Sequence, residues 1–420
     1  MTGKMRRWLE PVKTALIVFL SLSALVLMYF TGLFDFLLPE RGSGTFILPE
    51  TPSLSLTAAS LPTEAAVTGQ SGLCYGLKYD SAALRELYDS MSAYLGEAIG
   101  SAEKPQRISE KRWLKLLDSA GLYLDYDCDL PLSLLAAWLG VEAPVSPYFH
   151  TLVLSEGEAG TVCFNYLDEK GQGWSCRTAG LWKSLAGQLD AYLPNGASFA
   201  QHWTALKSCE PAMLVLESLP ELYAVSVSGG QEAAAAVLAE KTGIHLNSVS
   251  RYSEPDGTVV YPGENGVLRL RADGSLSFSA SEDFALAEEE SLPNIAELSR
   301  ELLEELHLAF AGDELLRCDG CRVDGCGSGE VTFSYVCEGL PVLLPAGSAA
   351  RLHWTEGRLT ELTFLPRCCR LSTGRVELLP EKQAAAAAGS RSPGSEAGLR
   401  LYDSGEAVMQ PFWSVIPAAN

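Results

Sequence analysis

The chain has 420 residues, of which 47% are hydrophobic and 20% are charged, and its formal net charge is −21. This length exceeds what one ordinary core accommodates, so we expect two or three globular modules. The acidic balance argues against nucleic acid, anionic lipid and wall polymer as direct ligands, because phosphate binding needs clustered Lys and Arg.

The first forty residues carry a localisation signal. Residues 14–34 are uncharged and, as a helix, are long enough to cross the hydrocarbon core of a bilayer. Basic residues gather before this stretch, so the positive-inside rule predicts a cytoplasmic N-terminus (1–13), a transmembrane signal anchor (14–36) and a largely extracytoplasmic, single-pass protein of the cell membrane. A cleavable signal peptide is the alternative, but the apolar run is long for one and no A-x-A-like site closely follows it.

One face of this segment is a candidate partner-helix face. Ser21, Ala24, Met28 and Thr31 follow a 3-4-3 spacing and would form one stripe on a helix. Small and hydroxyl residues let a second transmembrane helix approach closely. In the alternative interpretation, Ser and Thr face lipid and bond their own backbone.

The rest of the chain divides by composition and periodicity. Residues 37–70 are rich in Pro, Gly, Ser and Thr, which predicts a flexible tether. Alternating strand and helix patterns then predict three extracytoplasmic α+β domains, over 71–195, 196–285 and 286–420. The expected fold class is therefore α+β with antiparallel hairpins, behind one N-terminal transmembrane helix.

The last two of these domains contain similar stretches. Asp273-Gly274 and Glu356-Gly357 each separate two apolar runs, and glycine reaches positive φ without a Cβ clash, so each pair predicts a hairpin turn. A predicted helix precedes each hairpin. We interpret the similarity as an internal duplication; a chance recurrence of two hairpins in a β-rich chain is the alternative.

Catalytic and metal-binding patterns are scarce. The five histidines form no H-x-x-x-H, and no G-x-S-x-G elbow, Walker loop or G-x-G-x-x-G is present. Residues 125–129 (DYDCD) begin like a calcium loop, but Leu130 and Ala136 stand where glycine and the bidentate Glu belong. We interpret them as an edge strand with solvated carboxylates. No catalytic residue, cofactor or metal is expected.

The one pointed cysteine cluster is CDGCRVDGC, with Cys318, Cys321 and Cys326, followed by Cys337. C-x-x-C with further thiols can begin a zinc site, but the second C-x-x-C of a zinc ribbon is missing. Disulfides, or free thiols in an anaerobic host, are the favoured interpretations of the eleven cysteines.

Several stretches, taken in order, carry a family resemblance. They are the N-terminal anchor, LYLDYDCDLPLSLLAAWLG, YSEPDGTVVYPGENGVLRLRADGSLSFSA, VTFSYVCEGLPVLLP, LLPEKQAAAAA and LRLYDSGEAVMQPFWSV. Together they resemble the YycH/YycI family of Gram-positive bacteria, nearer to the YycH branch; the cysteine cluster departs from the family pattern. The resemblance implies a non-enzymatic regulator of a cell-wall two-component system. Its transmembrane helix and outer domains would contact a WalK-like sensor histidine kinase, with a YycI-like protein as a further partner.

Two other functions are weighed against this regulator. A membrane-tethered cell-wall or ligand-binding module without a kinase partner needs exposed aromatic rings or a polar cleft. Four tryptophans lie instead in apolar runs typical of a core: Trp138, Trp182, Trp354 and Trp413. A hydrolase or thiol oxidoreductase needs paired carboxylates in a cleft, or the C-x-x-C thiols at a helix N-terminus.

Overall fold

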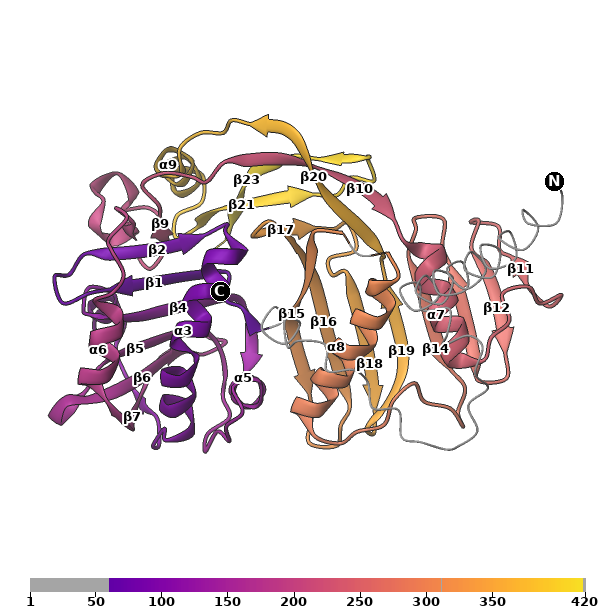
Figure 1. Ribbon diagram of the computed structural model, residues 1–420, viewed down its shortest axis with the longest axis horizontal. Coiled ribbons are helices and arrows are strands. Elements are labelled where there is room, and N and C mark those ends of the chain that lie inside the picture. Colours follow the sequence, from indigo (N-terminus) through magenta and orange to yellow (C-terminus); the bar gives the residue numbers. More distant parts are fainter. Residues whose placement is uncertain (1–59, 311, 418–420) are drawn as a thin grey trace, which may run out of the picture. The chain divides into compact units, whose positions relative to one another are not determined.

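The computed structural model describes residues 60–310 and 312–417, which belong to one compact unit (Figure 1). Strands hold 40% of the residues and helices 26%, and the strands form several sheets. The α+β fold class expected from local patterns is therefore wrong. Local patterns predict some of the individual strands correctly, but each large sheet combines strands from distant parts of the chain.

The expected transmembrane helix, residues 14–36, lies outside the described residues. Among residues 60–310 and 312–417, no helix combines the length and the apolar character needed to cross a membrane. The two longest of them, α3 (Ser81–Gly100) and α8 (Leu292–Leu308), expose charged side chains such as Glu97 and Glu305. The expectation of a single-pass membrane location is corrected on this finding.

A seven-stranded antiparallel sheet follows the order β2-β1-β4-β5-β6-β7-β3. Its strands are β1 (Glu64–Thr68), β2 (Cys74–Lys78), β3 (Gln106–Arg107), β4 (Gly121–Pro131), β5 (Tyr148–Glu156), β6 (Thr161–Leu167) and β7 (Gly173–Leu181). β1 lies between β2 and β4 and is largely buried. The expected tether (37–70) is therefore wrong over the residues that form β1. The sequence of β1, EAAVT, is short and resembles a linker, and it forms a strand because β2 and β4 pair with it on both sides.

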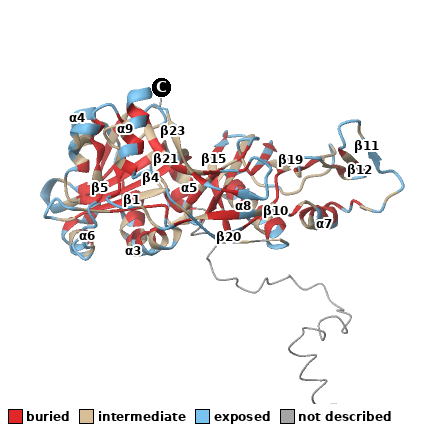
Figure 2. Cartoon of the chain, turned by 90° about the horizontal axis from the view of Figure 1, so that it is seen from above, coloured by how far each residue is buried: buried red, intermediate tan, exposed pale blue. Residues whose placement is uncertain are grey.

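The two faces of this sheet differ in polarity. Ala65, Leu124 and Leu152 are aligned across neighbouring strands on the apolar face. The helices α5 (Leu132–Trp138) and α6 (Trp182–Leu189) contact β4, and α3 contacts β2, β6 and β7. Glu64, Asp125 and Thr151 are aligned on the opposite face. Seen from above, α4 (Glu110–Leu117) and α9 (Glu381–Arg391) lie on the other side of the sheet from α3 and α6 (Figure 2).

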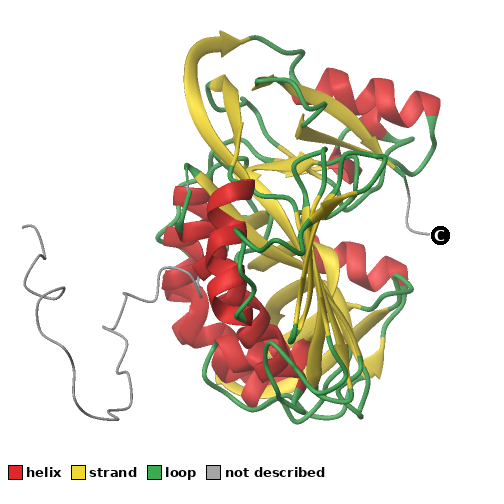
Figure 3. Cartoon of the chain, turned by 90° about the vertical axis from the view of Figure 1, so that its right-hand side faces the viewer, coloured by secondary structure: helices red, strands yellow, loops and turns green. Residues whose placement is uncertain are grey.

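An eleven-stranded sheet follows the order β11-β12-β13-β14-β19-β18-β16-β17-β21-β23, with β15 also paired to β16. Its strands are β11 (Tyr252–Ser253), β12 (Val259–Gly263), β13 (Gly266–Leu270), β14 (Leu276–Ala280), β15 (Glu314–Val323), β16 (Gly329–Cys337), β17 (Leu340–Leu343), β18 (Ala350–Thr355), β19 (Arg358–Phe364), β21 (Glu396–Tyr402) and β23 (Pro411–Ile416). Seen from the side, most helices gather on one face of the strands (Figure 3).

The remaining elements are short or connect these sheets. β10 (Leu222–Gly229) pairs with β20 (Arg367–Val376) and β22 (Val408–Met409), and β8 (Ser198–Phe199) pairs with β9 (Leu214–Val215). The helix α7 (Gln231–Thr242) packs against α8. Three 3₁₀ turns complete the described chain: η1 (Glu158–Gly160), η2 (Ala200–His202) and η3 (Thr204–Leu206).

The two similar hairpins meet within the larger sheet. β14 pairs antiparallel with β19, and Phe278 lies opposite Leu362, so the order there is β13-β14-β19-β18. Gly274 and Gly357 occupy the two hairpin turns at φ 87° and 74°, a region that side chains disfavour. Strand pairing therefore joins segments on both sides of residue 285, where a domain boundary was expected.

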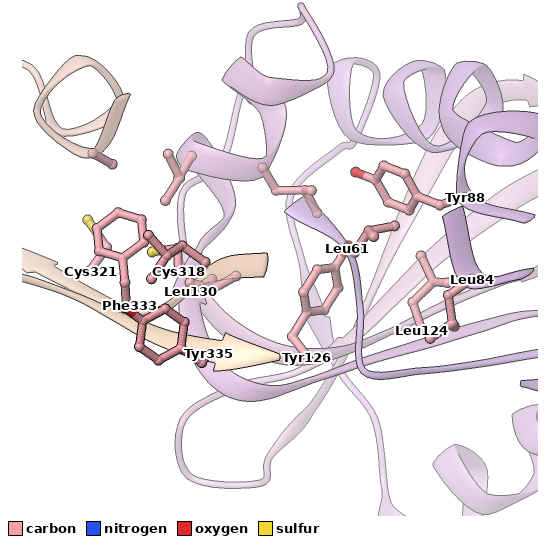
Figure 4. Packing of buried hydrophobic residues seen from close by; sticks show 14 of the residues in the cluster. Leu61, Leu84, Tyr88, Leu124, Tyr126, Leu130, Cys318, Cys321, Phe333 and Tyr335 are labelled. Atoms are coloured by element: carbon pink, nitrogen blue, oxygen red, sulfur yellow. The ribbon is translucent and has the colours of Figure 1, made fainter. Parts of the chain in front are cut away.

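One apolar core runs through both sheets. Figure 4 shows Tyr126 and Leu130 of β4 near Cys318, Phe333 and Tyr335 of β15 and β16, all of them buried. Contacts between β4 and β15 make this the place where the two sheets share their interior.

Candidate functional site

The residues expected to face a partner helix, Ser21, Ala24, Met28 and Thr31, lie outside the described residues. Of the four tryptophans expected in the core, Trp182 and Trp354 are buried, whereas Trp138 and Trp413 are partly exposed.

The C-x-x-C cysteines lie on a strand, not in a loop or at a helix N-terminus. A β-bulge between Cys318 and Gly320 shifts the register of β15, and both Cys318 and Cys321 are buried. Cys326 lies exposed in the β15–β16 turn, and Cys337 is buried on β16. Among residues 60–310 and 312–417, no three His, Cys, Asp or Glu side chains converge to hold a metal ion.

These positions predict unequal thiol reactivity. Burial raises the pKa of Cys321 to about 12 and raises that of Cys318 well above its ordinary value, and the thiolate is the reactive form. At pH 8 we expect iodoacetamide to modify Cys326 at least about tenfold faster than Cys321 in the folded protein. Peptide mass spectrometry over a time course measures both rates, with urea-unfolded protein as the control in which they converge. Equal rates in the folded protein would contradict the placement of Cys321 in the core.

A buried charge cluster lies where β1, β2 and α9 meet. The Lys78 ammonium is 2.7 Å from Glu64 and 3.3 Å from Glu381, and it donates a hydrogen bond to the Leu214 carbonyl at 2.6 Å. Lys78 and Glu381 are each 2% exposed. Glu381 opens α9, where the helix dipole favours a carboxylate, and it also accepts the Leu216 N–H at 2.7 Å.

Two further carboxylates complete this cluster, which we call the Lys78 junction (Glu64, Lys78, Asp125, Glu381 and Glu396). Asp125 accepts hydrogen bonds from the Thr151 hydroxyl at 2.6 Å and the Asp127 N–H at 2.8 Å. The interpretation of DYDCD as an edge strand with solvated carboxylates is therefore wrong at Asp125, where β4 lies between β1 and β5, whereas Asp127 is exposed. Only the pairing of those strands encloses Asp125.

The junction holds four carboxylates and one ammonium, and the pKa values of two of the carboxyl groups are raised. Burial raises the pKa of Glu64 to about 7, against the opposing effect of Lys78. Burial and the neighbouring Glu64 raise the pKa of Glu396 well above its ordinary value. The stability with which the junction joins these chain segments should therefore depend on pH.

Tyr79, next to Lys78, links the junction to the C-terminal strands. Its hydroxyl accepts the Leu399 N–H at 3.2 Å, and its ring meets Trp413 edge-on with centroids 6.4 Å apart. At Gly339 (φ 79°), a Cβ would lie 2.4 Å from the Tyr79 backbone, so only glycine permits this approach of the β16–β17 turn. The N-terminal sheet and the last strands are thus packed together at one point.

A second site is a groove of about 390 Å³ along α3, beside the end of α5. We call it the α3 groove. Its lining includes the small residues Ser92 and Gly96, the carboxylates Asp89 and Glu97, and the ring of Trp138. Asp89 and Glu97 are exposed, so the groove is open to solvent.

Neither site has a linear signature. Lys78 and Glu381 are 303 residues apart, and the acidic residues of α3 look like an ordinary solvated helix face. Comparison with known proteins finds no matching family model, no similar curated protein and no similar solved structure.

Proposed function

We propose that the chain is a non-enzymatic regulatory protein that binds a sensor histidine kinase and tunes its activity, as the resemblance to the YycH/YycI family implies. Its support is where the resembling stretches lie in the fold. Those within the described residues form β4 with α5, β11 to β14, β16 with β17, α9, and β21 to β23. Elements of four of these stretches, β4, the β16–β17 turn, α9 and β21, supply residues that meet at the Lys78 junction or at Tyr79.

Such a junction suits a regulator because it couples distant surfaces. A partner bound to one part of the unit would bias how the other part packs, and a coupling of about 1–3 kcal/mol changes an affinity about 5- to 150-fold. A YycI-like protein would be a second partner acting on the same unit.

The test is crosslinking and affinity purification of the tagged full-length chain from its own host, with mass spectrometry of the bound proteins. We expect a sensor histidine kinase to be enriched over an equally tagged acidic control protein. Binding is then repeated with purified kinase by titration calorimetry. Recovery of wall polymer without a kinase, or no binding to the purified kinase, would reject the proposal and favour a ligand-binding module.

A further inference from the structure

Two cysteine side chains from different strands meet in the core. Cys337 is the last residue of β16 and is 0% exposed, and Cys369, near the start of β20, is 1% exposed. Their thiols are hydrogen-bonding partners of each other. The fold therefore places two sulfurs side by side that no spacing in the sequence brings together.

The backbone on both sides fixes this approach. The Tyr335 hydroxyl accepts the Arg367 N–H at 3.1 Å, so this face of β16 lies against the start of β20. Successive side chains alternate between the faces of a strand, so Cys337 points the same way as Tyr335. Cys369 is likewise two residues beyond Arg367. The two thiols thus meet one step further along the same pair of segments.

A buried carboxylate holds Cys369 in this position. Cys337 lies opposite Glu314 in the β15–β16 ladder, and opposite side chains share a face of the sheet. The Glu314 carboxylate accepts the Cys369 N–H at 2.6 Å, and the Asp313 N–H donates to the Cys369 carbonyl at 2.7 Å. The backbone of Cys369 is therefore fixed on the face from which Cys337 projects.

We propose that Cys337 and Cys369 form a disulfide when the chain folds in the presence of a small-molecule disulfide, and that this bond ties β20 to β16. One protein thiolate attacks the oxidant, breaks its S–S bond and releases one small thiol. The second thiolate attacks this mixed disulfide, forms the protein S–S bond and releases the second small thiol. Two electrons pass to the oxidant, and the two small thiols take up the two protons. The inference goes beyond the proposed function and does not depend on it.

The reaction belongs to folding, because the folded dithiol is protected. The hydrogen bond with Cys337, and burial after it, raise the pKa of Cys369 far above its ordinary value, and the thiolate is the attacking form. Both residues are also closed to an oxidant from solvent. The bond therefore forms before the core closes, and it is then shielded from external thiols.

The test refolds the reduced, urea-unfolded full chain in a buffer of reduced and oxidised glutathione, with a second sample in reductant alone. After alkylation of the remaining thiols, trypsin and a glutamate-specific protease isolate Cys337 in residues 331–338 and Cys369 in residues 368–370. We expect these two peptides, joined by a disulfide, to be the most abundant cross-linked species in mass spectrometry. In Cys369→Ala this species should fall at least about tenfold.

The matched control is Cys368→Ala, which removes the adjacent thiol. The Cys368 sulfur lies against Gly312, 3.0 Å from where a Cβ would stand on that residue. The linked peptides should persist in this variant. Near-ultraviolet circular dichroism verifies that both variants are folded, and the peptides of the unsubstituted chain decide the pairing even if one variant does not fold.

The bond should also stabilise the fold. It closes a loop of about thirty residues, so oxidation should lower the unfolding equilibrium constant in urea at least about 30-fold. In Cys369→Ala, the oxidised and reduced samples should unfold alike. Absence of the linked peptides, their persistence in Cys369→Ala, or links spread evenly over the other cysteines would overturn the pairing. Equal unfolding constants for the oxidised and reduced unsubstituted chain would overturn the tie between β20 and β16.

Discussion

Replacing Lys78 with methionine is expected to lower the free energy of unfolding by about 3–5 kcal/mol. The change leaves Glu64 and Glu381 beside each other without the ammonium that lies 2.7 Å and 3.3 Å from them. Glu381 is 2% exposed, so water cannot replace the lost partner. Urea unfolding followed by circular dichroism measures the difference from the unsubstituted chain.

The matched control is Lys241→Met, which breaks the exposed ion pair with Glu305. That pair is solvated, so its loss should cost about 0–1 kcal/mol. Adding Glu64→Gln and Glu381→Gln to Lys78→Met should restore part of the stability, because the unpaired charges are then removed as well. If Lys78→Met cost no more than Lys241→Met, the junction would contribute nothing to holding the fold together.

Between pH 5 and pH 8, Glu64→Gln and Glu396→Gln are expected to lose less stability than the unsubstituted chain. The folded pKa of both carboxyl groups is raised, so the folded state binds more protons than the unfolded state in this range. Their stabilising contribution is complete below about pH 4.5 and is lost as pH rises through the folded pKa. For Glu64, the rise from 4.5 to about 7 corresponds to at most about 3 kcal/mol, because its side chain is 20% exposed.

The measurement is the free energy of unfolding in urea at pH 5, 6.5 and 8, compared as the difference between each variant and the unsubstituted chain. This difference isolates the junction from carboxylates such as Glu314, whose lowered pKa acts in the opposite direction and at lower pH. Glu86→Gln serves as the exposed control and should follow the unsubstituted chain. If the two Gln variants also did so, the carboxyl groups would titrate normally and the pH-dependent junction would be rejected.

Local features of the fold were open to prediction because their causes are local. A short turn with glycine at positive φ specifies a hairpin over about ten residues, and both the Gly274 and the Gly357 turns form as their spacing indicates. The apolar spacing of α3 likewise indicates a helix with one buried face. The excess of negative charge and the positions of the cysteines along the chain also follow directly from the sequence.

The errors came where burial depends on neighbours that are distant in the chain. β1 resembled a linker, and Asp125 resembled a solvated residue of an edge strand, until β2, β4 and β5 enclosed them. The α3 groove could not be anticipated either, because Trp138 reaches it from α5 and lies in a run that indicates a core residue.

Local patterns specify the hairpin turns, most helices and many of the strands, and the composition specifies the excess of negative charge. Which strands pair depends on the complete fold, and this pairing buries one ammonium among four carboxylates drawn from β1, β4, α9 and β21. The cause is the different distance along the chain over which the interactions act. Backbone propensity and turn chemistry act over a few residues, whereas desolvation of a charge depends on every segment that the fold brings against it.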